Sequence, residues 1–65
     1  MYQLVDEPKG GTLAEAFNVL DDAFGTGEFS ENQGVSALAL GMEVDDSRAS
    51  ELLRNLVARE CVEEV

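Results

Sequence analysis

Three of the four basic residues, Arg48, Arg54 and Arg59, fall within one short segment, and the single lysine lies elsewhere. An arginine can bridge a guanine edge or a phosphate, and Asn55, in the same segment, is of a type that can pair with an adenine edge. On one face of a helix this set would form a candidate surface for nucleic acid. The alternative is a charged outer face that only contacts solvent, with Glu51 paired to Arg54 or Asn55.

The segment that carries these residues is predicted to be an amphipathic helix from Asp45 to Arg59. Its apolar residues recur with the spacing of one buried helical face, namely Ala49, Leu52, Leu53, Leu56 and Val57. Asp45 or Asp46 can accept hydrogen bonds from the free N–H groups of the first turn and suits the helix dipole there. The opposite face is then centred on Ser47, Glu51, Arg54 and Ala58, with Arg48, Asn55 and Arg59 on one flank.

Two further helices are predicted before it, each with a capping box. Thr12 and Glu15 have capping-box spacing, and the first helix then runs to Gly25 with one apolar face, formed by Leu13, Phe17, Leu20 and Phe24. Ser30 and Gln33 repeat that spacing, and Gly41 is expected to end the second helix in the left-handed conformation. The buried face of the second helix is expected to comprise Val35, Leu38 and Ala39, with Leu40 and Met42 also in the core.

The two ends of the chain are predicted to be short strands that pair with each other, Tyr2 to Val5 and Cys61 to Val65. We therefore expect one domain over residues 1–65, mainly α with a small β-sheet. No apolar run approaches the length that spans a bilayer and no signal peptide is recognised, so a cytoplasmic protein is expected.

Catalytic and metal chemistry find little support in the residue types. There is no histidine, Cys61 is the only cysteine, and it is read as a buried strand thiol. The run from Asp22 to Gln33 resembles a calcium loop, but Phe24 and Gln33 replace two essential ligands. We expect no enzyme, no catalytic, metal or cofactor site, and no small-molecule substrate.

The acidity of the chain is its strongest compositional feature. Fourteen Asp and Glu residues against four Lys and Arg give a formal net charge of −10, and the acidic residues occur in every segment. This composition resembles that of cytoplasmic proteins from halophilic archaea, in which salt screens the self-repulsion. We expect folding to require high salt. The alternative is an acidic interaction module from an ordinary organism.

From Ser30 to Val65 the chain resembles the winged helix-turn-helix domains of archaeal and bacterial transcription regulators, such as the MarR-like and ArsR-like groups. The resemblance rests on Leu53-Arg54-Asn55-Leu56-Val57, followed by Val62-Glu63 at the distance of a wing strand. It implies a three-helix, winged-helix-like fold with a truncated wing. Glu60 stands where these regulators usually place Gly, so we expect a turn that avoids the left-handed conformation. The DNA-binding residues implied are Ser47, Arg48, Ser50, Glu51 and Arg54, beside Asn55.

Two functions follow from these observations. The first is a small DNA-binding transcriptional regulator that uses helix 45–59 as its recognition helix on double-stranded DNA, as a homodimer. The second is a protein–protein interaction module, a homodimer or an adaptor, on the same helix-turn-helix scaffold without DNA binding.

Overall fold

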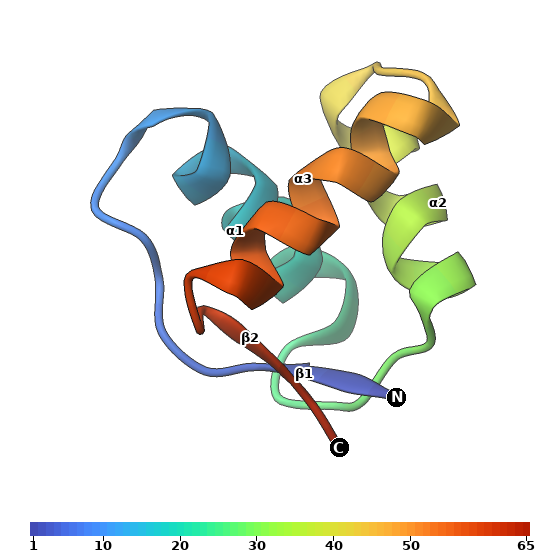
Figure 1. The fold of residues 1–65 in the computed structure, drawn as a ribbon. Helices are drawn as coiled ribbons and strands as arrows, with labels where there is room; N and C mark the ends of the chain where they lie inside the picture. The colour runs from blue at the N-terminus through green and yellow to red at the C-terminus, as the bar shows by residue number, and fades with distance from the viewer.

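A computed structural model describes residues 1–65 and shows three helices with a small antiparallel sheet made by the two ends of the chain (Figure 1). The element order is β1 (Tyr2–Leu4), α1 (Gly11–Phe24), α2 (Glu31–Met42), α3 (Asp46–Ala58) and β2 (Val62–Glu64). The predicted class, mainly α with a small sheet of paired terminal strands, is confirmed. None of the helices is long and apolar enough to cross a membrane.

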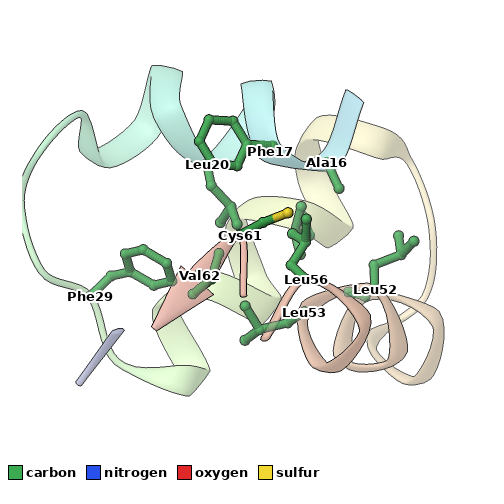
Figure 2. Packing of buried hydrophobic residues seen from close by; sticks show 11 residues of the cluster. Ala16, Phe17, Leu20, Phe29, Leu52, Leu53, Leu56, Cys61 and Val62 are labelled. Atoms are coloured by element: carbon green, nitrogen blue, oxygen red, sulfur yellow. The ribbon is translucent and has the colours of Figure 1, made fainter. Parts of the chain in front are cut away.

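One hydrophobic core joins all five elements. Figure 2 shows Leu20 from α1 facing Leu53 and Leu56 from α3, with Cys61 and Val62 between them. The largest fully buried side chains are Phe29, Leu20, Leu38, Leu52, Leu56 and Val62, and no polar or charged residue is buried. The buried face predicted for α3 is confirmed at four of its five positions, and Val57 is half-buried. The periodicity of the apolar residues therefore orients α3 with its polar face outward.

The sheet places β1 between two neighbours. β1 pairs with β2 in antiparallel register, with Leu4 opposite Val62. On the other edge of β1, Tyr2 forms an isolated bridge with Phe29, which precedes α2. Tyr2 N–H donates to the carbonyl of Phe29 at 2.7 Å, and Phe29 N–H returns a bond to Tyr2 at 2.9 Å. β1 thus lies between β2 and the segment that leads into α2.

Only one of the two predicted capping boxes forms. The Ser30 hydroxyl accepts from Gln33 N–H at 3.1 Å, and the Gln33 side chain accepts from Ser30 N–H at 2.8 Å. The box predicted at Thr12 is wrong, because the cap is Gly10, two residues earlier, and α1 has no side-chain cap. Gly10 and Gly11 adopt positive φ angles of 101° and 78° that admit this early start. Thr12 then lies inside the first turn, where its hydroxyl does not serve as the cap.

The predicted end of α2 at Gly41 is also wrong. The helix continues to Met42, and Glu43 adopts the left-handed conformation with φ 55°. Gly41 has a packing role instead, since a Cβ at that position would overlap the Cγ1 atom of Val19 on α1. Leu40 does not enter the core as expected, because the helix turns its side chain outward and leaves 83% of it exposed.

The turn between α3 and β2 also differs from the expected one, because it too contains a left-handed residue that is not glycine. Arg59 caps α3, and Glu60 then adopts φ 62°, the left-handed conformation that we expected the chain to avoid. The carbonyl of Leu56 accepts from Cys61 N–H at 3.0 Å and so closes the turn. The turn therefore has the backbone shape that glycine favours, with a steric cost at Glu60.

Candidate nucleic-acid interface

The outward face of α3 carries all six residues predicted to bind DNA. Asp45 caps this helix, accepting from Arg48 N–H at 2.8 Å, so the helix begins where the sequence predicts. Five of the six residues are exposed, namely Ser47, Arg48, Glu51, Arg54 and Asn55. Ser50 is half-buried because it faces the first turn of α2. The structure therefore brings the predicted set onto one side of one helix.

The single ion pair of the protein lies within this set and joins Arg48 to Glu51. The alternative reading, in which Glu51 pairs with Arg54 or Asn55, is wrong in its choice of partner. Both side chains of the observed pair remain largely exposed, at 46% for Arg48 and 62% for Glu51. An exposed pair of this kind contributes less than about 1 kcal/mol, so Arg48 can exchange Glu51 for another acceptor at little cost.

Arg54 is the arginine of the set with no carboxylate partner. It lines a hollow of about 140 Å³ between α3 and the start of α2, together with Ser50 and Glu31. A second, shallower hollow adjoins it and adds Asn32, Asp46 and Ser47 to the lining. The guanidinium of Arg54 keeps all its N–H donors available to an incoming acceptor.

Sequence reasoning missed the contribution of α2 to this surface. Glu31 and Asn32 occupy its first turn, directly after the Ser30 cap, and face Arg54 across the hollow. The close approach depends on Gly34, where a Cβ would lie 3.0 Å from the Phe29 ring and 3.3 Å from Leu53. Gly34 is the signal that could have located Glu31 and Asn32. A glycine one turn after a helix cap can mark the place where that helix packs closely on a neighbour.

The electrostatics of the surface are mixed. Glu31 and Asp46 line the shallower hollow together with Arg54, and Glu51 lies one helical turn before it, so the positive charge of Arg54 acts only at short range. Arg48 and Arg59 lie near the two ends of α3, about 16 Å apart along the axis at 1.5 Å per residue. Such a surface can donate hydrogen bonds to base edges but attracts phosphates weakly.

The exposed side chains of α3 are donors and acceptors of the kinds that read base edges, with one unpaired arginine near their centre. Comparisons of the chain with models of protein families, with curated proteins and with solved structures find no match.

Proposed function

We propose that the protein is a small transcriptional regulator that binds double-stranded DNA, with α3 in the major groove. The observation that carries this proposal is Arg54, which is exposed, free of any ion pair and flanked on the same face by Asn55. An α-helix of this length fits the major groove, and its polar face would lie against the bases. The short connection between α2 and α3, which begins with the left-handed Glu43, supports the proposal, because a helix-turn-helix joins its two helices by a turn of a few residues.

The net charge of −10 decides which contacts would provide the affinity. Phosphate contacts supply most of the affinity of ordinary DNA-binding proteins and weaken steeply with salt. Here Arg48 and Arg54 on α3 and Arg59 at its end are outnumbered by the fourteen Asp and Glu residues of the chain, so the phosphate contribution is small and contacts to base edges must dominate. A homodimer that presents two copies of α3 one helical turn of DNA apart, about 34 Å, would double those contacts.

The experiment that tests the proposal is a chemical-shift titration of labelled protein with mixed-sequence duplex DNA, at about 0.2 M and about 2 M KCl, salt levels between which purely phosphate-driven binding vanishes. Shifts confined to Ser47 through Arg59 that survive the higher salt would support a base-reading helix. No shift at either salt, with the fold intact, would refute DNA binding and favour the interaction with a protein partner.

A pair of variants separates base reading from simple loss of charge. Replacing Arg54 by Ala should weaken binding to a selected duplex by roughly tenfold or more, because one bidentate arginine–guanine contact contributes about 1–3 kcal/mol. The matched control is Lys9→Ala, which removes the same charge outside α3. Since Arg54 is exposed and unpaired, its loss should leave the melting temperature unchanged. Equal DNA affinity of the two variants would contradict the proposal.

A further inference from the structure

Three of the four large exposed hydrophobic residues of the protein gather at the small sheet. Met1, Val5 and Val65 are 51%, 46% and 51% exposed, and only Leu40 lies elsewhere, on α2. The antiparallel hydrogen bonds continue beyond the strands, from Val65 N–H to the Met1 carbonyl and from Val5 N–H to the Cys61 carbonyl, both at 2.8 Å. Residues from the two ends of the chain thus form one surface.

Strand alternation places these three side chains on the face of the sheet that points away from the core. Leu4 and Val62 stand opposite each other and pack against the core, so they mark the inner face. Residues one position away along each strand point to the other side. This outer sheet face comprises Met1, Gln3, Val5, Glu63 and Val65, all of them at least partly exposed. Cys61 precedes β2 and departs from the alternation, since its side chain is buried in the core.

The centre of the outer sheet face is a polar contact. Gln3 Nε2 donates to Glu63 Oε1 at 3.3 Å, directly between the apolar ends of the two strands. Glu63 is exposed, so its second carboxylate oxygen stays available to a donor from outside. Apolar side chains around a free carboxylate form a pattern that an amphipathic, positively charged segment would complement.

Two more exposed carboxylates adjoin the outer sheet face along the chain, those of Asp6 and Glu64. Asp6 follows Val5, and its N–H donates to the Cys61 carbonyl, so it lies beside the turn that holds Glu60. Glu64, the last residue of β2, is exposed beside Glu63, on the side of the sheet that also carries Val62. The basic side chains nearest in sequence are Arg59 and Lys9. This excess of carboxylates over basic side chains favours the binding of cationic groups at the outer sheet face.

We propose that the outer sheet face binds a basic, amphipathic segment of another protein. Its apolar residues would cover Met1, Val5 and Val65, and its Lys or Arg residues would meet Glu63 and the adjoining carboxylates. A second copy of this chain fits the same face poorly, because docking would bring two sets of carboxylates, each on a molecule of net charge −10, against each other.

The test uses a synthetic helical peptide with Leu at positions i, i+3, i+4 and i+7 and Lys elsewhere, together with a scrambled peptide of the same composition. Any cationic peptide would be attracted to so acidic a protein, so the informative quantity is the preference for the patterned peptide. By calorimetry the wild-type protein should bind the patterned peptide about tenfold more tightly than the scrambled one, from burial of the half-exposed side chains.

Two variants of equal charge locate the interaction. Val5→Ser combined with Val65→Ser should abolish the preference for the patterned peptide, and Leu40→Ser, which removes an exposed leucine outside the sheet, should leave it unchanged. Circular dichroism would establish that both variants are folded. Equal preference in wild type and the double variant, or no preference in wild type, would overturn the proposal. Self-association in molar KCl that the double variant loses would assign the face to a second copy and overturn it as well.

Discussion

Replacing Gly41 by Ala should reveal an energetic coupling between α1 and α2. The added methyl would overlap Cγ1 of Val19 and lie 3.1 Å from its Cγ2. Overpacking of this kind costs about 1–3 kcal/mol. The same change removes a glycine from a helix, which stabilises by about 1 kcal/mol. Gly41→Ala alone should therefore lower the free energy of unfolding by between zero and about 2 kcal/mol.

The sign should reverse once Val19 is shortened. In a Val19→Ala background both Cγ methyls are gone, and the nearest atom to the new methyl is the Cβ of residue 19, at 3.3 Å. That contact is tight but is relieved by a shift of a few tenths of an ångström, so the helix-propensity gain dominates and Gly41→Ala should stabilise the protein by up to about 1 kcal/mol. The difference between the two backgrounds, a coupling of about 1–3 kcal/mol, is what a double-mutant cycle measures.

Urea unfolding followed by far-UV circular dichroism gives the four free energies of the cycle. The matched control is Ser36→Ala, another change to Ala at an exposed site on α2, which should combine additively with Val19→Ala. If the effects of Gly41→Ala in the two backgrounds agree within about 0.5 kcal/mol, the two helices are not in the close contact described and the reasoning fails.

Two further predictions concern the ends of α3. Asp45→Ala removes the hydrogen bond to Arg48 N–H and should cost about 1 kcal/mol in a urea titration. Asp46→Ala, which removes an equal charge but no cap, should cost less, and equal losses would refute the assignment of Asp45 as the cap. Glu60→Gly relieves the left-handed conformation of a residue with a Cβ and should stabilise by about 1 kcal/mol, raising Tm by roughly 4–8 °C. Glu60→Ala keeps the Cβ, so an equal rise in Tm for both variants would contradict the strain at this turn.

The fold class could be predicted because apolar periodicity and strand-like ends are local properties of the sequence. Helix ends depended on more than local spacing. Ser30 and Thr12 begin capping-box patterns of the same spacing, yet only Ser30 caps its helix, since glycines before Thr12 let α1 begin earlier. Gly41 looks like a helix stop in sequence, but it lies within α2, where a Cβ would overlap Val19 on another helix. Backbone freedom decided the first case, and packing between helices explains the glycine in the second.

The candidate site also has features that the sequence predicts and features that it does not. The outward face of α3 follows directly from its buried face, so the six residues were correctly grouped. The choice of Arg48 as the partner of Glu51 was not predictable, because several neighbours on one helix face compete for a carboxylate at similar energies. The presence of Glu31 beside Arg54 depends on how closely α2 approaches α3, which Gly34 permits.

The DNA-binding face proposed on α3 and the outer sheet face share no residue. Binding at one should nevertheless affect binding at the other through the electrostatic field of the protein. DNA approaching α3 meets the field of a molecule with net charge −10, to which Glu63 and the other carboxylates beside the sheet contribute. A basic segment bound on the outer sheet face would neutralise part of that charge and reduce the repulsion of phosphates. Binding at the two surfaces would then be cooperative, and by linkage DNA would strengthen binding of the segment by the same factor. Salt screens charges beyond a few Å at molar concentration, so this cooperativity would be largest in dilute buffer and would fade in concentrated KCl.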